Sequence, residues 1–186
     1  MALSKEVAAL DAPVSGSTPQ VEQGTLIVFV GGEPKAYESI SAILDVLGRH
    51  VHMGPSGAGT TMKLVTNTLL GLGVEALAEA VALGRKAGLE TARLLDALQL
   101  TAVVSPAQRG KFENIKSGDY PAAFALRMMS KDYSLILRLA ESHSVPMPAT
   151  AVAKQIDNIE NARSRGRDED FSAVIRTIQE LSGLDS

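Results

Sequence analysis

Lys63 and Asn67 are the pair of side chains whose types and spacing best suit chemistry in this sequence. They lie in the stretch GPSGAGTTMKLVTN, residues 54–67. Four residues apart on a predicted helix, they share one face and are about 6 Å apart along its axis. An ammonium group with restricted hydration can transfer a proton, and a neighbouring Asn can hydrogen-bond a hydroxyl or carbonyl. A solvated lysine near an unrelated asparagine explains this spacing equally well.

The same stretch predicts a place where an anion could bind. Gly57 and Gly59 fall where the helix is expected to begin. Glycines at such a position let a ligand approach the backbone, and free N–H groups at a helix start attract negative charge.

A second candidate is the turn in DAPVSGS, residues 11–17. Ser15, Gly16 and Ser17 follow a short predicted strand. Successive backbone N–H groups in such a turn can hold a carboxylate. An ordinary turn is the simpler interpretation of these residues when they are taken alone.

A third candidate is MSKDYSLILRLAESH, residues 129–143, an amphipathic helical pattern with Lys131 and Asp132 near its start. The acidic residue complements the helix dipole, which explains it without any function. The lysine is equally able to reach a phosphate or a cofactor amide.

Other kinds of site are disfavoured. The chain has no Cys, which excludes disulfides, thiolate zinc sites and a Cys nucleophile. His50 and His52 alternate on a predicted strand without an evident third ligand, so we expect no metal site and interpret them as covering a strand edge. The net charge of −3 and the 4% aromatic content give no reason to expect nucleic acid or an anionic membrane as a partner.

Two apolar segments bear on localisation. MALSKEVAAL, at the start, has no apolar core long enough for a signal peptide. The stretch 64–83 is interrupted by Asn67, Glu75 and Glu79, which favours a buried helix over a transmembrane segment. We therefore expect a protein of the cytoplasm or of an organelle matrix.

The elements that position these residues divide the chain unequally. Strand and helix signals alternate only to about residue 54, which suggests a βαβ unit with parallel pairing. Within it, the apolar run at 25–30 is typical of a strand covered on both faces. The elements expected there are strands at 11–14, 25–30 and 50–53 and a helix at 34–47.

Only helices are predicted after this point. The longest is apolar nearly all round, which is typical of a helix at the centre of a domain or in an interface. The fold class is therefore mainly α, with a small α/β piece at residues 1–56 and an all-helical domain at 57–186. The predicted helices are 58–86, 90–99, 105–116, 125–143, 148–163 and 171–182.

Three segments, in order, resemble the signature blocks of the β-hydroxyacid dehydrogenases. They are DAPVSGS, GPSGAGTTMKLVTN and MSKDYSLILRLA, and GTLIVFVGG between the first two is also similar to the family. This is the 3-hydroxyisobutyrate dehydrogenase and tartronate semialdehyde reductase group, related to 6-phosphogluconate dehydrogenase. The resemblance covers residues 11 to about 182, and the order and spacing of the blocks are more specific than any one of them.

The resemblance implies hydride transfer between the C3 hydroxyl of a small 3-hydroxy acid and NAD or NADP. Lys63 would be the catalytic general acid/base, and Asn67 would orient the substrate oxygen. Ser15, Gly16 and Ser17 would bind the substrate carboxylate. Lys131 would lie close to the cofactor, and Asp132 would be structural or support another site residue.

The resemblance also implies a fold and an assembly. It implies a helical domain like that of 6-phosphogluconate dehydrogenase, preceded by part of a Rossmann domain. The helical domain would make a dimer or tetramer interface, which suits the apolar helix at 58–86.

The sequence departs from the family at two points. Ser17 stands where the family usually has Gly. No Gly-x-Gly-x-x-Gly turn follows a first strand, so we expect residues 1–56 to be a truncated remnant of the NAD(P)-binding domain. Catalysis by this chain alone is then in doubt, because a nicotinamide must be bound to exchange hydride.

Three alternatives to a self-sufficient enzyme stay open. The chain is either the incomplete oxidoreductase or a non-catalytic module that folds and oligomerises, and a separately supplied Rossmann domain is a third possibility. Lys63 and Asn67 favour the enzyme, because non-catalytic relatives generally lack that lysine. We also predict that the apolar sheet edge at residues 11–14 is covered by MALSKEVAAL or by another subunit.

Overall fold

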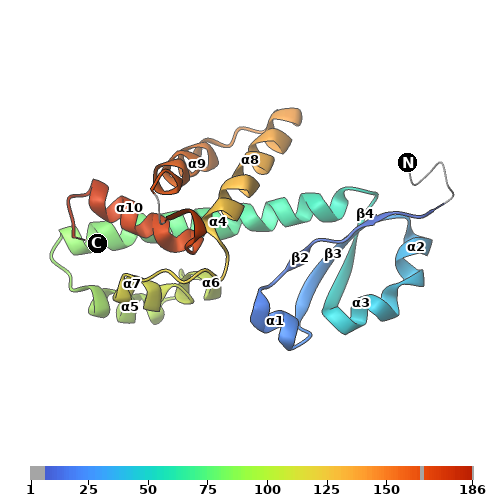
Figure 1. Ribbon diagram of the computed structural model, residues 1–186, viewed down its shortest axis with the longest axis horizontal. Coiled ribbons are helices and arrows are strands. Elements are labelled where there is room, and N and C mark those ends of the chain that lie inside the picture. Colours follow the sequence, from blue (N-terminus) through green and yellow to red (C-terminus); the bar gives the residue numbers. More distant parts are fainter. Residues whose placement is uncertain (1–6, 164–165, 186) are drawn as a thin grey trace. The chain divides into compact units, whose positions relative to one another are not determined.

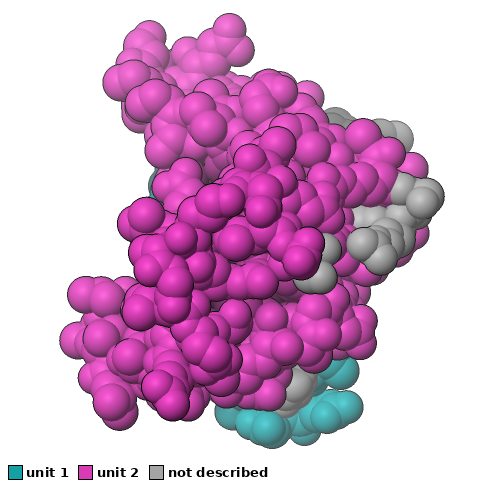
Figure 2. Space-filling view, turned by 90° about the vertical axis from the view of Figure 1, so that its left-hand side faces the viewer, with its two compact units in different colours: residues 1–66 teal, residues 67–186 magenta. Residues whose placement is uncertain are grey.

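The structure is a computed structural model that describes residues 7–163 and 166–185. Its contacts divide the chain into two compact units, Met1–Thr66 and Asn67–Ser186, shown in separate colours in Figure 2. The helix α4, Ala58–Lys86, begins in the first unit and continues into the second. The two units are described in turn, and the domain boundary at residues 56 and 57 stays a prediction.

The first unit is built on a four-stranded sheet around β3, Leu26–Gly32 (Figure 1). The strand β4, Gly48–Gly54, pairs with β3 in parallel, which confirms the predicted βαβ pairing. The short strands β1, Leu10–Asp11, and β2, Val14–Ser15, pair antiparallel with β3. The predicted strand 11–14 is thus two strands, and the break includes Pro13, which has no N–H for a sheet ladder.

Two helices of this unit, α2, Pro34–Ser39, and α3, Ser41–Leu47, cover one face of the sheet. A third helix, α1, Thr18–Glu22, follows β2. The single predicted helix at 34–47 is wrong, because Ile40 leaves helical geometry at φ −113° and ψ 6°. This break lets both helices pack on the strand, where Tyr37, Ile40 and Leu44 meet Val28 and Val30.

The other face of the sheet is only partly covered by the described residues. Ile27 is 41% exposed and Val51 is 47% exposed. The prediction that residues 25–30 are covered on both faces is therefore wrong at Ile27, although the rest of β3 is buried. Val14, at the predicted apolar edge, is 38% exposed, and the predicted cover by MALSKEVAAL falls largely on residues 1–6, outside the described residues.

His50 and His52 both contact Tyr37. His50 Nδ1 lies 2.7 Å from the Tyr37 hydroxyl, and its Nε2 lies 3.1 Å from Asp45. His52 Nε2 lies 2.8 Å from the carbonyl of Gly32, and its ring stacks on that of Tyr37. These contacts fix α2 and α3 against β4. Among the described residues, no group of three or more His, Cys, Asp or Glu could hold a metal ion.

The second unit is entirely helical in its described residues. The predicted helix at 105–116 is two helices, because Gly110 and Lys111 separate them. The elements are α5, Thr91–Gln99, α6, Pro106–Arg109, α7, Phe112–Ser117, α8, Leu126–Ser142, α9, Pro148–Asn161, α10, Val174–Leu181, and the short 3₁₀ segments η2, Gly166–Asp168, and η3, Phe171–Ala173. With the small sheet of the first unit, this confirms the predicted mainly α fold.

Glycines of α4 mark where other helices approach it closely. A Cβ on Gly71 would lie 2.3 Å from the hydroxyl oxygen of Tyr133, which is on α8 and buried. The carbonyl oxygen of Gly73 accepts a hydrogen bond of 2.6 Å from the Nε2 of Gln108, on α6. A Cβ on Gly84 would lie 2.8 Å from Leu94 of α5.

The apolar surface of α4 is buried on one side only. Val74, Leu77 and Val81 are buried, whereas Leu69 and Leu83 are each 73% exposed. Within this chain one side of the helix is therefore buried, and the predicted role of the other side in an interface stays a prediction. By length and composition α4 could also cross a membrane, but the core helices of water-soluble domains pass the same test, so this is weak support for a membrane location.

Two glycines of α4 provide a matched test of this packing. We predict that Gly71→Ala lowers the free energy of unfolding by about 1–3 kcal/mol, because the added methyl displaces the buried Tyr133 ring. Gly73→Ala should be neutral or stabilise by up to about 1 kcal/mol, because its Cβ meets Gln108 at an ordinary 3.5 Å. Urea denaturation followed by circular dichroism measures both, and equal stability of the two variants would contradict the prediction.

Candidate functional site

The start of α4 is occupied by a carboxylate of the chain itself. Asp11, on β1, accepts hydrogen bonds of 2.6 Å from the backbone N–H groups of Gly57 and Thr60. Burial raises the pKa of Asp11, but these hydrogen bonds more than offset it, so the pKa lies below its ordinary value. The predicted attraction for an anion is real, but an internal side chain satisfies it. Sequence reasoning did not assign this role to Asp11.

Gly59 serves close packing in this arrangement. A Cβ there would lie 2.4 Å from the carbonyl oxygen of Phe29 and 3.0 Å from the backbone nitrogen of Gly31. A Cβ on Gly31 would lie 2.3 Å from the Asp11 carboxylate. The glycines therefore let β3 and the first turn of α4 meet with the carboxylate between them, rather than opening the backbone to a ligand.

The turn of Ser15, Gly16 and Ser17 directs two donors at one point. Both the backbone N–H and the hydroxyl of Ser17 donate to the side-chain oxygen of Gln20, at 2.9 and 3.0 Å. Gly16 has φ +131°, which favours glycine, and a Cβ there would lie 2.6 Å from Leu26. Ser15 is half-buried at the end of β2. The turn therefore has the convergent donors that a carboxylate requires, with an amide oxygen bound to them.

Lys63 and Asn67 both belong to α4 and are one turn apart along it. Lys63 is half-buried, whereas Asn67 is 2% exposed. Asn67 donates its amide nitrogen to Asp132 of α8 at 2.6 Å. Asn67 is therefore a buried, hydrogen-bonded residue of the helical unit and not a surface residue.

Lys131 and Asp132 continue this contact on α8. The carboxylate of Asp132 is buried, and its other oxygen lies 2.9 Å from the ammonium of Lys131. The side chain of Lys131 is 53% exposed. Asn67, Asp132 and Lys131 thus form one chain of polar contacts, in which the charge of the buried carboxylate is balanced from the surface.

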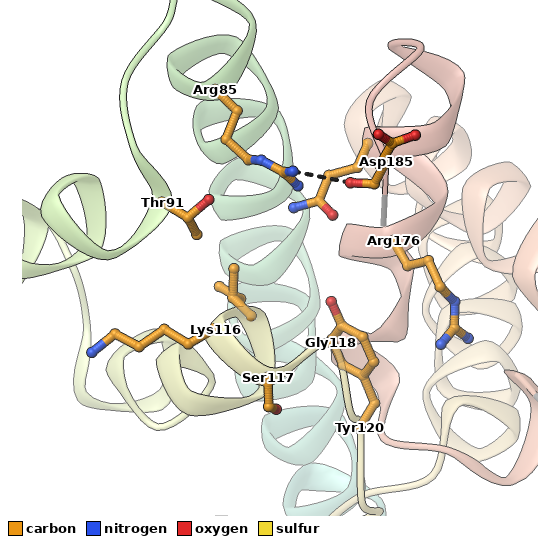
Figure 3. A pocket seen from close by; sticks show the side chains of 10 residues that line it. Arg85, Thr91, Lys116, Ser117, Gly118, Tyr120, Arg176 and Asp185 are labelled. Atoms are coloured by element: carbon orange, nitrogen blue, oxygen red, sulfur yellow. Dashed lines mark hydrogen bonds between the residues drawn. The ribbon is translucent and has the colours of Figure 1, made fainter.

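A partly open pocket of about 400 Å³ lies elsewhere in the helical unit (Figure 3). At its edge Arg85 donates a hydrogen bond of 3.0 Å to the backbone carbonyl of Asp185. Arg85 is 18 residues after Asn67 on α4, about 27 Å along the helix axis. None of the predicted site residues lines this cavity, whose lining includes Arg85, Lys116, Tyr120, Arg176, Gln179 and Asp185.

Sequence analysis missed an acidic pair in the helical unit, the half-buried Glu75 and the buried Asp157. Burial, together with the charges of Asp157 and Glu79, raises the pKa of Glu75 to about 8. Burial raises the pKa of Asp157, on α9, to about 7, and Lys154 opposes that rise. Burial and both carboxylates also raise the pKa of Tyr133. Asp157 is 1% exposed, and its Oδ2 has no hydrogen-bond partner among the described residues.

The sequence could have pointed to this pair only in part. Glu75 interrupts an apolar run on α4, which is a visible signal. Asp157 lies among polar residues of α9 and is recognisable as buried only when that helix packs against its neighbours.

Two family models match this chain, one over the helical part and one over the part that contains the sheet. Residues 57–178 match the family model described as NAD-binding of NADP-dependent 3-hydroxyisobutyrate dehydrogenase. Residues 1–54 match the model of the NAD binding domain of 6-phosphogluconate dehydrogenase. The crystal structure of 3-hydroxyisobutyrate dehydrogenase from Salmonella typhimurium superimposes with a TM-score of 0.85 at 28% identity, covering 94% of this chain and 62% of that one.

Curated relatives include both oxidoreductases and a nuclear factor. The chain is 39% identical to 2-(hydroxymethyl)glutarate dehydrogenase of Eubacterium barkeri, over 99% of this chain and 62% of that protein. It is 38% identical to glyoxylate/succinic semialdehyde reductase 1 of Arabidopsis thaliana, over 91% of this chain and 59% of that protein. It is 34% identical to the cytokine-like nuclear factor N-PAC of Aedes aegypti, over 79% of this chain and 26% of that protein. The chain thus spans less than two thirds of the length of each.

The pair of Glu75 and Asp157 predicts how the stability of the fold depends on pH. The folded-state pKa of each group is raised, so the protonated groups stabilise the folded state. This contribution to the free energy of unfolding is complete below about pH 4, the pKa of ordinary carboxyls in the unfolded chain, and it is lost as the pH rises through about 7 and 8. We therefore expect the melting temperature to fall between pH 5 and pH 9, and Asp157→Asn to reduce that fall by removing one ionisation.

Thermal unfolding across this pH range measures the effect. Asp96→Asn is the matched control, because the side chain of Asp96 is 73% exposed. Asp96→Asn should lose as much melting temperature between pH 5 and pH 9 as the unsubstituted chain does. An equally large fall for Asp157→Asn would show that Asp157 does not titrate in this range.

Proposed function

We propose that this chain, which belongs to the 3-hydroxyisobutyrate dehydrogenase family, provides the proton-transfer and substrate-binding residues of an NAD(P)-dependent oxidoreductase acting on small 3-hydroxy carboxylic acids. The observation that supports this most strongly is the buried Asn67, held by Asp132 one helical turn after Lys63. The printed activities of the oxidoreductase relatives agree with a small hydroxy or oxo acid as substrate.

Lys63 would move the proton. In the oxidation direction, its neutral amine accepts the proton of the C3 hydroxyl while the hydride on the same carbon leaves, so that a carbonyl forms. In the reverse direction, the ammonium returns this proton to the carbonyl oxygen. The half-buried position of Lys63 favours this role, because reduced hydration makes an ammonium a better acid.

Asn67 would orient the substrate oxygen. Its amide nitrogen donates to Asp132, so the orientation of the amide is fixed before substrate binds. The ion pair between Asp132 and Lys131 balances the charge that this buried carboxylate would otherwise leave uncompensated. Asp132 is thus a positioning residue that acts through Asn67.

The turn of Ser15, Gly16 and Ser17 would bind the substrate carboxylate. The two donors of Ser17 hold the Gln20 side-chain oxygen, and a carboxylate oxygen could replace this acceptor without leaving the donors unpaired. The serine at position 17, where the family usually has glycine, adds the hydroxyl donor to the backbone N–H.

The cofactor of this family, NAD or NADP, would accept or supply the hydride when bound. Lys131 would lie near it, and its half-exposed ammonium is available for a polar contact. The start of α4 does not suit the dinucleotide phosphates, because Asp11 already accepts its N–H groups. We therefore propose that the residues of this chain bind the substrate and transfer its proton, and we assign none of them to binding the pyrophosphate.

The assembly and location that we propose follow the family resemblance. The exposed apolar residues of α4, Leu69 and Leu83, suit an interface of a dimer or tetramer. We propose no nucleic-acid or membrane partner, and a location in the cytoplasm or an organelle matrix. The alternative function is a non-catalytic binding or oligomerisation module; one relative, N-PAC, is named a cytokine-like nuclear factor and not an oxidoreductase.

A cofactor titration of the 186-residue chain, followed by an activity assay, separates these functions. We expect NADPH-dependent reduction of succinic or tartronate semialdehyde by a chimera in which the preceding segment of the Eubacterium barkeri relative is joined to this chain. Lys63→Ala in the chimera should lower turnover by about 10²- to 10⁴-fold, the usual range for a general acid/base, with cofactor affinity nearly unchanged.

Lys35→Ala is the control for this substitution, because Lys35 is an exposed lysine on α2. It should leave turnover unchanged. Near-normal turnover of Lys63→Ala would remove Lys63 from its role. A chimera that binds NADPH but reduces none of these substrates would favour the non-catalytic module.

A further inference from the structure

A basic pocket lies between α8 and α9, the two helices that run side by side in the helical unit (Figure 1). Its volume is about 360 Å³. This is at the lower end of the range for small-molecule sites, about 300–1,000 Å³. The lining includes four cations and, among the described residues, no carboxylate: Arg127, Ser130, Lys131, Lys154, Asn161 and Arg167.

The floor of the pocket is formed around Ser130. This serine is 6% exposed, and its hydroxyl oxygen accepts hydrogen bonds from Lys154 Nζ at 2.6 Å and from Asn161 Nδ2 at 2.9 Å. A hydroxyl has two acceptor positions and one donor, so both acceptor positions are used and its proton is directed elsewhere. The ammonium and the amide each have further N–H groups beyond these bonds. The floor therefore has an excess of donors.

The charges around the pocket are only partly compensated. Arg127 pairs with Asp168 at 2.9 Å, and Lys131 pairs with Asp132 at 2.9 Å. Both acids lie outside the lining. Lys154 makes no ion pair within 4.0 Å among the described residues, and the acid that its charge acts on is Asp157, one turn along α9. A positive charge and spare donors thus meet at Lys154.

We propose that this pocket is a binding site for a phosphate group, either free or carried on a small metabolite. A phosphate dianion offers several strong acceptor oxygens on one centre and matches a pocket that combines several cations with hydroxyl and amide donors. The volume leaves room for a few atoms attached to the phosphate. This inference depends on the helical unit alone and does not depend on the proposed redox chemistry.

Calorimetric titration of the 186-residue chain tests the site. The probes are inorganic phosphate and glycerol 3-phosphate, with sodium chloride keeping the ionic strength constant because exposed charges are screened by salt. We expect saturable binding of phosphate with a Kd of about 1 mM or below. Tighter binding of glycerol 3-phosphate would identify a carried phosphate, and equal binding would identify free phosphate. Both results support the site.

Lys154→Met should weaken phosphate binding by about tenfold or more, the effect of about 1.4 kcal/mol. Lys35→Met is the matched control, an exposed lysine on α2 of the first unit, and should bind as the unsubstituted chain does. Arg127→Met is a second test that does not disturb the core, because the side chain of Arg127 is 50% exposed. It should weaken binding about threefold or more by the loss of one charged contact.

Two results would overturn the proposal. One is the absence of saturable binding by the unsubstituted chain up to about 20 mM phosphate, a concentration at which even a weak site of this kind would fill. The other is phosphate binding by Lys154→Met that equals that of Lys35→Met. If circular dichroism shows that Lys154→Met does not fold, binding by Arg127→Met decides the question in the same way.

Discussion

The close approach of α8 to α4 at Gly71 is the contact on which the helical unit depends. Only a residue without a side chain lets the buried ring of Tyr133 lie against the backbone of α4. One turn before Gly71, the same approach brings Asn67 to Asp132. The packing contact and the polar contact are therefore two results of one crossing, and the position of the candidate site follows from the packing.

This crossing also explains the charged groups near it. Glu75 lies one turn beyond Gly71 on α4. Its charge raises the pKa of Tyr133, and the charge of Asp157 in turn raises the pKa of Glu75. Poor solvation favours the protonated form of both carboxyls. Asp132, on α8, has Asn67 as a donor and Lys131 as a counter-ion. The acids near the crossing thus have different partners.

The start of α4 shows how one feature of sequence can have two explanations. Gly57 and Gly59 predict a place for a bound anion, and an anion is there, but it is Asp11. The local sequence predicts that a negative charge is stabilised at a helix start. It cannot show that Asp11, 46 positions before Gly57, provides that charge, because this depends on the pairing of β1 with β3.

The same limit separates the predictions that were confirmed from those that were wrong. The bounds of α4 and the parallel pairing of β3 with β4 follow from local patterns, and both are confirmed. The burial of Asp157 depends on packing against distant segments, and no local signal predicts it. The break at Gly110 has a local signal, because glycine is a poor helix former. Lys63 and Ser15 are indicated by local residue patterns, and the roles that the family resemblance implies for them stay predictions.

Lys131 connects the two sites that we propose in this chain. Its ammonium pairs with Asp132, which holds Asn67, and the same side chain lines the basic pocket between α8 and α9. A phosphate in that pocket would compete with Asp132 for this one cation. Loss of the ion pair would leave the buried carboxylate with Asn67 as its hydrogen-bond donor, and the contact between them would bear more of its charge. Phosphate in the pocket and the orientation of Asn67 would then be coupled through Asp132, and by thermodynamic linkage each would influence the other.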